Sequence, residues 1–347
     1  MEVYNKSFKI PVDPPLAVEK KTFAYTDFGS PGKIIFQRYH DDINITQISF
    51  ENNLTLNIKP TDFEKNTIYV GVRVGGGELT IPKNKPGLSF LADTTFIEGG
   101  LVEHSADELK QILSNKKVDL KFSVGTDAFI FTGKTSPQDL LSQLQLLTAY
   151  IIDPGYRMEA LHSAHKDFDQ LYVKLKRTPQ GIIQNVVSLY ISIGDVRFCY
   201  PDKKNMLSYE FNDVSTWLSD VLKSDPIEVS IVGDLNLAET IKGVSVTLGS
   251  LPERKVKKPD YTNERKVYFV QARDTQSFTF HSKISKGIAA VYWPTDDIWD
   301  ISQTRRFNVL SFIFSDRMRV KIREEMGQAY SPYSVSRPSD TYTKFGY

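Results

Sequence analysis

Two hydrogen-bond donors stand close together near the end of a predicted helix. Arg323 and Tyr330 are seven residues apart in the stretch REEMGQAY. A guanidinium and a phenol can both donate hydrogen bonds to a carbonyl oxygen or an oxyanion. An ordinary surface helix followed by a turn explains the same residues, so the spacing alone leaves both interpretations open.

The residues before this pair predict the helix that must carry it. Apolar residues recur every three or four positions and form one stripe, at Phe307, Leu310, Phe314, Met318 and Ile322. Basic residues fill the other face, at Arg317, Arg319, Lys321 and Arg323. Gly327 is placed to end the helix, so we expect the chain to turn just before Tyr330.

This stretch resembles a signature in the C-terminal half of pitrilysin- and insulysin-type zinc metallopeptidases, the inverted-zinc-motif family. In that family the helix and turn read roughly L-R-E-E-x-G-x-x-Y. The resemblance extends along the chain from about residue 45 to the end. It implies that Arg323 and Tyr330 contact a peptide substrate.

A second helix, predicted over residues 86–98, carries the positions at which this family binds zinc. In the catalytic half of these peptidases the equivalent helix reads His-x-x-Glu-His, in which two imidazoles bind the metal and the Glu activates water. Here Ser89, Ala92 and Asp93 replace these three residues. We therefore expect no zinc site in this helix, and the resemblance implies a degenerate, non-catalytic copy of the peptidase domain.

Other motifs give weaker signals. Of the five histidines, only His162 and His165 are close, with Asp167 and Asp169 nearby, and a solvated helix face is expected because three metal ligands are not evident. The glycine run at residues 75–77 lacks the Lys-Ser/Thr of a phosphate loop, so a turn that tolerates positive φ is expected.

Length, net charge and cysteine count limit the classes of protein to which this chain can belong. The 347 residues are enough for about two domains. The net charge of +1 gives no electrostatic case for nucleic acid or an anionic membrane, and we see no apolar run of membrane-spanning length. Cys199 is the only cysteine, which excludes an internal disulfide but leaves the redox compartment open.

The pattern along the chain predicts an α+β fold. A hairpin is expected around Asn52-Asn53, followed by strands over 67–74, 118–124, 128–132 and 228–233. Helices are expected over 106–113, with Ser105 and Glu108 as a capping box, and over 136–152, 157–176, 179–193, 211–222 and 237–241. By resemblance, these helices pack on one face of an antiparallel-rich sheet.

The strand pattern restarts after residue 265. Strands are predicted over 267–272, 278–280, 287–293, 333–336 and 342–347. The expected domains are a connector over 1–44, a degenerate peptidase-like domain over 45–250, a solvated linker over 251–264, and an incomplete second peptidase-like domain over 265–347. Because the second unit is incomplete, we expect a fragment of a longer protein, and the resemblance implies that this protein is a long bacterial-type zinc protease.

The resemblance also implies a mechanism. An upstream catalytic half, in the same polypeptide or in a partner subunit, would supply zinc and the general base, while this half forms the far wall of a peptide chamber and is inactive alone. The implied partners are that half and the peptide, and a periplasmic or cell-envelope location is favoured over the cytoplasm. Two alternatives stay open: a non-catalytic scaffold subunit, and a peptide-binding module that uses a strand edge.

Overall fold

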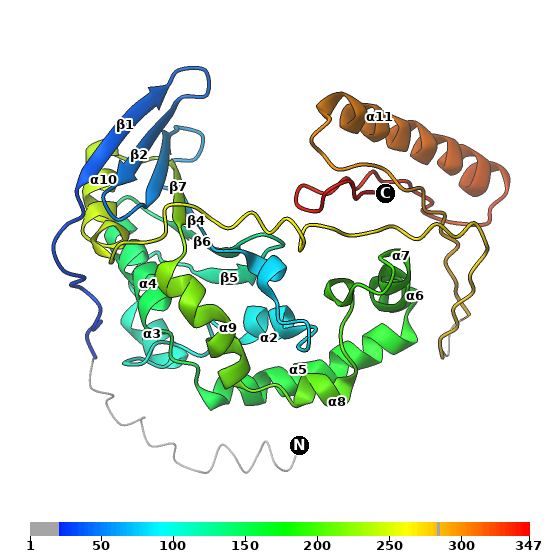
Figure 1. The fold of residues 1–347 in the computed structure, drawn as a ribbon, viewed down its shortest axis with the longest axis horizontal. Coiled ribbons are helices and arrows are strands. Elements are labelled where there is room, and N and C mark those ends of the chain that lie inside the picture. Colours follow the sequence, from blue (N-terminus) through cyan, green and yellow to red (C-terminus); the bar gives the residue numbers. More distant parts are fainter. Residues whose placement is uncertain (1–20, 283–284) are drawn as a thin grey trace, which may run out of the picture.

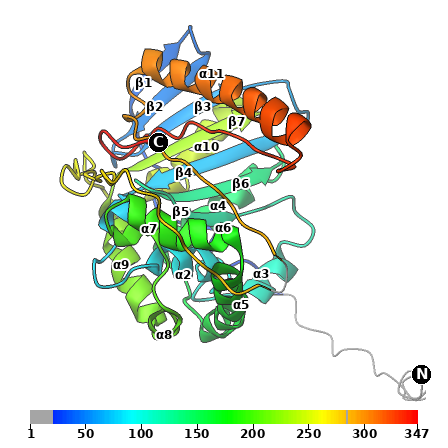
Figure 2. The same ribbon diagram turned by 90° about the vertical axis from the view of Figure 1, so that its right-hand side faces the viewer.

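A seven-stranded sheet forms the centre of the first 250 residues. The computed structural model describes residues 21–282 and 285–347 (Figure 1). The strand order is β1-β2-β3-β7-β4-β6-β5, and every neighbouring pair is antiparallel except β3 and β7. The strands are β1 (Ile34–His40), β2 (Ile45–Phe50), β3 (Thr55–Pro60), β4 (Ile68–Val74), β5 (Lys121–Val124), β6 (Phe129–Thr135) and β7 (Ile227–Gly233). The strands lie side by side as one sheet in Figure 2.

Helices cover one face of this sheet. The alternating burial along β7 shows one buried and one exposed face, as expected for an antiparallel-rich sheet in an α+β protein. The main helices of this layer are α2 (Leu88–Thr95), α3 (Ala106–Ile112), α4 (Leu140–Ile152), α5 (Met158–Arg177), α9 (Phe211–Ser224) and α10 (Leu237–Ser245). The predicted fold class is therefore confirmed.

Shorter elements complete the first unit. They are η1 (Gly77–Thr80), α6 (Pro179–Ile182), η2 (Ile183–Val187), α7 (Ser188–Ile191), η3 (Val196–Phe198), α8 (Lys203–Leu207) and η4 (Leu248–Ser250). The predicted capping box is present, since Ser105 Oγ accepts from the Glu108 amide and the Glu108 carboxylate accepts from the Ser105 amide.

Part of the predicted connector belongs to the sheet. Its first 20 residues lie outside the described ranges, but residues 34–40 form β1, which pairs with β2. The segment before β1 is held by long-range contacts. Tyr25 Oη donates to Asp153 Oδ2 over 2.5 Å, and the Gly32 amide donates to the Ser245 carbonyl over 2.9 Å. The apolar residues at 34–36 indicate only a short β-like piece, and because the first six residues of β1 are all exposed, no alternation of buried and exposed sides marks the whole strand.

The hairpin predicted around Asn52-Asn53 is confirmed as the β2–β3 turn. Asn53 adopts φ of 66°, the left-handed conformation that asparagine tolerates. The buried Asn52 amide group donates to the carbonyls of Leu248 and Leu251 over 3.0 and 3.1 Å. Its Oδ1 accepts from the Leu54 amide over 3.2 Å. One side chain therefore fixes the turn and ties it to the segment that follows α10.

Replacing Asn52 with alanine should lower the free energy of unfolding by about 1–3 kcal/mol, because two buried carbonyls lose their donor. Urea unfolding of this chain measures the change. Asn57→Ala serves as the control, since Asn57 lies on the same hairpin and its side chain makes only an exposed contact with Glu228 of the neighbouring strand β7. Equal losses in the two variants would contradict this account of the turn.

The predicted linker over 251–264 is not uniformly solvated. Arg254 is buried, and its guanidinium donates to the carbonyls of Leu222 and Asp225 at the end of α9, each over 2.9 Å. Lys255 pairs with Asp225 over 2.8 Å. The expectation of a solvated basic cluster is therefore wrong at Arg254, because the guanidinium satisfies carbonyls that the helix end leaves unpaired.

The second unit differs from the prediction in its strands. Between residue 265 and the end, the described residues contain isolated bridges, Lys266 with Thr343 and Gly346 with Thr295 and Pro338, in place of the five predicted strands. A strand is stabilised by neighbours at its edges and on its buried face. The segment that was expected to form the most apolar strand lacks both, since Val291 is 70% and Trp293 58% exposed.

Helix α11 (Ile301–Met318) and its continuation η5 (Arg319–Glu325) dominate the second unit. Figure 1 shows α11 with the C-terminal segment beside it, joined to the first unit by the extended chain that follows residue 250. A small cluster of Leu79, Val267, Tyr342 and Phe345 packs this segment against η1. The C-terminal segment is thereby anchored to the first unit.

Candidate functional site

The structure brings Arg323 and Tyr330 together at the end of α11. The helix changes to π geometry over η5, which contains Arg323, and π turns are frequent at functional sites. Gly327 has φ of 64° and ends the helix as predicted. The chain then turns back, so that the Arg323 guanidinium carbon lies 4.6 Å from the centre of the Tyr330 ring. Tyr330 is 80% exposed.

The charges around Arg323 leave its guanidinium available. Arg319 pairs with Asp316 over 2.8 Å and also with Glu324. Lys321 pairs with Glu325 over 2.6 Å. The three carboxylates nearest in sequence thus have other partners, and within the described ranges no carboxylate forms an ion pair with Arg323. The Arg323 guanidinium contacts the Tyr330 ring, so the hydrogen-bond donors of both exposed side chains lie close together.

A shallow depression surrounds the pair. It is lined by Ser315, Asp316, Arg319, Arg323, Tyr330, Ser331 and Pro332. Ser315, Arg319 and Arg323 follow one another at intervals of four residues, the spacing of neighbours along one helix face. That spacing indicates that Ser315 shares a helix face with Arg319 and Arg323, but nothing local in the sequence indicates what the Ser315 hydroxyl contacts.

The apolar stripe of α11 is less buried than its periodicity predicts. Leu310 and Phe314 are exposed, although Phe314 contacts the Trp293 ring at 5.9 Å between ring centres. Phe312, outside the stripe, is 76% exposed. Thr304 is the buried residue of this helix. The apolar stripe predicted for this helix is therefore only partly buried, because the segments beside α11 form no sheet to cover it.

The three zinc-motif positions on α2 have structural contacts. Ala92 is 0% exposed and packs in the core. Ser89 Oγ donates to Glu78 Oε1 over 3.3 Å, and Asp93 Oδ1 accepts from the Val124 amide over 2.5 Å at the end of β5. The described residues contain no group of three His, Cys, Asp or Glu side chains that could hold a metal ion. These positions do not fit zinc, because neither Ser89 nor Ala92 offers a metal-binding nitrogen, sulfur or carboxylate.

Asp93 has an unusual acidity. Solvent reaches part of this side chain, but the protein around it removes much of the water that would stabilise its charge. This loss, with the nearby Glu78, raises the pKa of Asp93 to about 7, although the hydrogen bond from Val124 acts in the opposite direction. The carboxyl of Asp93 therefore stays protonated up to a higher pH in the folded protein than an ordinary aspartate does.

Asp93→Asn should make the stability of this chain less dependent on pH. The pKa of Asp93 is about 7 in the folded protein, whereas the ordinary value of 3.8 applies to the unfolded chain. The folded state thus binds more protons between these values, and ionisation of Asp93 lowers stability as pH rises from about 4 to about 7. Asparagine keeps the acceptor for Val124 and does not ionise. Urea midpoints between pH 4 and 8 measure the difference, and identical pH profiles for the two proteins would contradict the assignment.

The weaker sequence motifs form no chemical site. His165 packs beside the Phe168 ring at 5.9 Å, and no third metal ligand joins His162 and His165 within the described ranges. Gly75 and Gly77 have φ of 62° and 54°, which confirms the predicted turn. A Cβ on Gly77 would lie 2.1 Å from the Gly125 carbonyl oxygen, so this position also requires close approach of two backbones.

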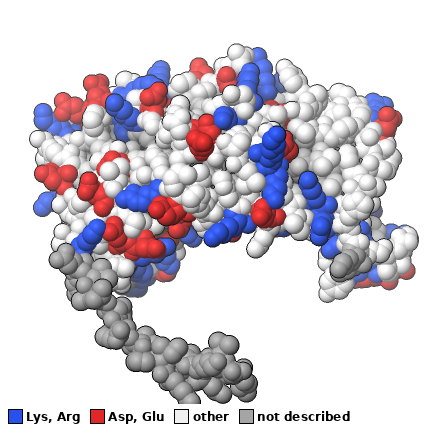
Figure 3. Space-filling model, turned by 90° about the horizontal axis from the view of Figure 1, so that it is seen from below, with Lys and Arg blue, Asp and Glu red and all other residues white. Residues whose placement is uncertain are grey.

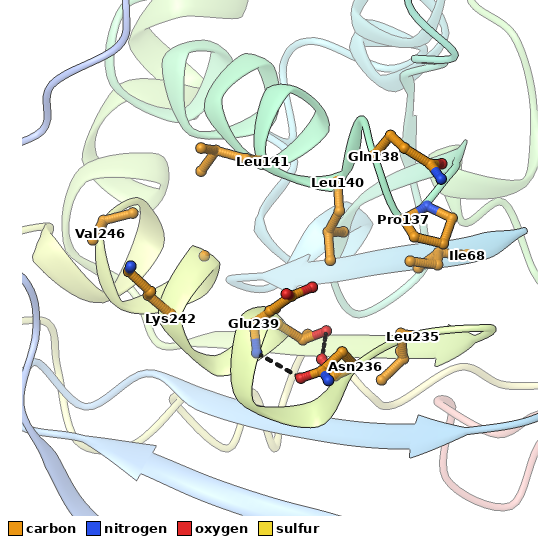
Figure 4. Close-up of a pocket in the computed structure, with 12 residues that line it drawn as sticks. Ile68, Pro137, Gln138, Leu140, Leu141, Leu235, Asn236, Glu239, Lys242 and Val246 are labelled. Carbon is orange, nitrogen blue, oxygen red and sulfur yellow. Dashed lines mark hydrogen bonds between the residues drawn. The ribbon is translucent and has the colours of Figure 1, made fainter. Parts of the chain in front are cut away.

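A second cavity lies between β4, the start of α4 and α10 (Figure 4). Apolar side chains such as Ile68, Leu140 and Leu235 line much of it. Its Asn236 side chain accepts from the Glu239 amide over 3.0 Å, and the Asn236 carbonyl accepts from Thr240 over 2.7 Å. These two bonds stabilise the first turn of α10.

The surface charge agrees with the small net charge. Acidic and basic side chains are interspersed on the face seen in Figure 3, which gives no field of one sign for a polyanion. None of the helices in the described ranges combines the length and the apolar character needed to cross a bilayer.

Comparisons with known proteins give a consistent result. Residues 208–347 match the family described as "Peptidase M16 inactive domain". The chain is 23% identical over 306 residues to the probable zinc protease PqqL of Haemophilus influenzae, which covers 86% of the chain and 32% of that protein. It is also 24% identical over 312 residues to the non-peptidase homolog YmxG of Helicobacter pylori, which covers 85% of the chain and 66% of that protein.

The fold matches part of a solved structure. The periplasmic protease PqqL from Escherichia coli superposes with a TM-score of 0.72 at 17% identity, covering 99% of this chain and 38% of that one. The chain therefore has the fold of part of a longer peptidase. It spans about a third of the length of both PqqL proteins.

Proposed function

We propose that this chain, which matches the family described as "Peptidase M16 inactive domain" over residues 208–347 and is similar to a probable zinc protease, is the non-catalytic half of a zinc-dependent endopeptidase. It forms the far wall of the chamber that encloses a peptide. The zinc, its ligands and the general base belong to a catalytic half, in the same polypeptide or in a partner subunit. This chain hydrolyses no peptide by itself.

The contact between Arg323 and Tyr330 is the observation that carries the proposal. The two side chains lie together, exposed, with 4.6 Å between the guanidinium carbon and the ring centre. The Arg323 guanidinium donates to the substrate carbonyl oxygen next to the scissile bond, and the Tyr330 phenol donates to the same region. Such donors act most strongly on the negative charge that develops on this oxygen in the transition state.

The catalytic half supplies the chemistry that this chain lacks. Zinc held by the ligands of that half would activate water and polarise the carbonyl. The α2 helix of this chain takes no part in that step, because Ser89, Ala92 and Asp93 are engaged in packing and hydrogen bonds of the fold. A periplasmic location is supported by the description of the related Escherichia coli PqqL as a periplasmic protease.

A photo-crosslinking experiment tests the position of the substrate. A peptide with a photoreactive group beside the scissile bond is bound to the assembled peptidase and irradiated, and the adduct is mapped by mass spectrometry. Adducts within residues 323–333 support the proposal. Adducts confined to other surfaces of this chain would contradict it.

A scaffold function is the second candidate. It is favoured by the similarity to YmxG of Helicobacter pylori, which is described as a non-peptidase homolog. The sequence of the half that pairs with this chain discriminates between the two candidates. A partner half with an intact His-x-x-Glu-His helix supports the peptidase, whereas two degenerate halves support the scaffold.

A peptide-binding module is a weaker third candidate. The sheet ends at β1 and β5, which are its two edge strands, and such edges can add an extended peptide. This function requires that the chain bind peptides without a catalytic half.

A further inference from the structure

We infer that Ser315 is a positioning residue that holds the segment carrying Tyr330 against α11. The inference rests on the proposed role of Tyr330 in binding substrate. Ser315 lies in the α-helical part of α11, before the π turn begins at Arg319. It lines the same depression as Arg323 and Tyr330.

Ser315 forms two hydrogen bonds with one residue of the returning chain. Its hydroxyl donates to the Ser334 carbonyl over 3.1 Å and accepts from the Ser334 amide over 2.8 Å. Both bonds are partly buried and join residues 19 positions apart. A hydroxyl can donate and accept at once, so a single side chain satisfies both backbone groups of Ser334.

These bonds fix the far end of an otherwise exposed segment. At its near end, the Gln328 amide donates to the Ile322 carbonyl over 3.0 Å, which ties the turn to η5. At its far end, Ser334 is tied to Ser315. Tyr330 lies between the two anchors, so both constrain where its ring can lie. Without the second anchor, residues 329–334 would gain conformational freedom and the Tyr330 phenol would be less often beside Arg323.

The helix provides the rigid support that this arrangement needs. Ser315, Arg319 and Arg323 follow at intervals of four residues, and Arg319 holds Asp316 and Glu324 in ion pairs. The substrate donors therefore come from two segments, the helix end and the returning chain. Ser315 is the side chain of the helix that fixes the second segment to the first.

Three variants test the inference. Ser315→Ala removes both hydrogen bonds, and Ser315→Thr keeps a hydroxyl that can form them. Ser311→Ala is the matched control one turn earlier, because the Ser311 hydroxyl donates within the helix, to the Asn308 carbonyl over 2.8 Å. All three are compared with the unaltered chain by amide hydrogen exchange and, in the assembled peptidase, by peptide turnover.

Hydrogen exchange reports on the anchor itself. Exchange over residues 328–334 should become faster in Ser315→Ala and stay unchanged in Ser315→Thr and Ser311→Ala. Unchanged exchange in Ser315→Ala would overturn the inference. This readout needs no peptidase activity, so it tests the anchor even if the proposed function is wrong.

Turnover reports on the role of the anchor. Ser315→Ala should lower kcat by roughly tenfold with little change in KM, since a displaced donor is lost mainly from the transition state. In a Tyr330→Phe background the same substitution should have almost no further effect. Full additivity of the two losses, or an equal loss in Ser311→Ala, would overturn the positioning role. Normal turnover in Tyr330→Phe alone would instead overturn the proposed function of Tyr330.

Discussion

Replacing Arg323 with alanine should lower kcat of the assembled peptidase by about 10²–10³-fold, the range seen when one oxyanion donor is removed. The expected effect is large because the guanidinium has no competing carboxylate in the described structure and faces solvent beside Tyr330. Steady-state hydrolysis of a fluorogenic peptide measures kcat and KM separately.

Two further variants sharpen this prediction. Tyr330→Phe keeps the ring that contacts Arg323 but removes the phenol donor, so it should lower kcat without releasing the guanidinium. Arg317→Ala removes an exposed cation from the same helix and should leave turnover nearly unchanged. Normal kcat in both Arg323→Ala and Tyr330→Phe would contradict the assignment. A similar loss in Arg317→Ala would show that the helix acts only through its general charge.

Ala92→Glu should cost about 3 kcal/mol or more in the free energy of unfolding of this chain. The substitution restores the residue type that activates water in the family motif, but Ala92 is 0% exposed in the core. A glutamate there would overpack the site and lose the hydration of its carboxylate, and both effects destabilise the folded state. Urea or thermal unfolding measures the loss.

The control for this variant lies on the same helix. Thr94→Glu places the same side chain at a half-exposed position two residues later, where it should cost far less. If Ala92→Glu were as stable as the unaltered chain, the helix would have room for the catalytic glutamate and the structural account of the degenerate positions would be wrong. A large loss would show that the zinc motif cannot be restored here without rebuilding the core around α2.

Much of the first unit could be predicted from local patterns. The β2–β3 hairpin follows from the Asn52-Asn53 turn between alternating apolar residues, and α3 follows from its capping box. These signals are local because the turn and cap residues satisfy neighbouring backbone groups. Only a short β-like piece at residues 34–36 was indicated for the edge strand β1, because the strand is exposed on both faces and lacks a periodic pattern.

The second unit shows the limit of the same reasoning. The apolar run that ends at Trp293 has the composition of a strand, but a strand also needs paired neighbours, and no strand pairs with this run in the described part of the chain. The proximity of Arg323 and Tyr330 was predictable because Gly327 ends the helix between them. The role of Ser315 was not, because its bonds join residues 19 positions apart and leave no short-range pattern in the sequence.

Cleavage of a quenched fluorescent peptide mixture tests the central claim most directly. The chain is assayed alone, then together with a zinc-bearing catalytic half, and each sample is measured with and without a zinc chelator. The account predicts activity only in the combined sample and its loss on chelation. Cleavage by this chain alone would contradict the account, and no cleavage by a properly assembled pair would favour the scaffold.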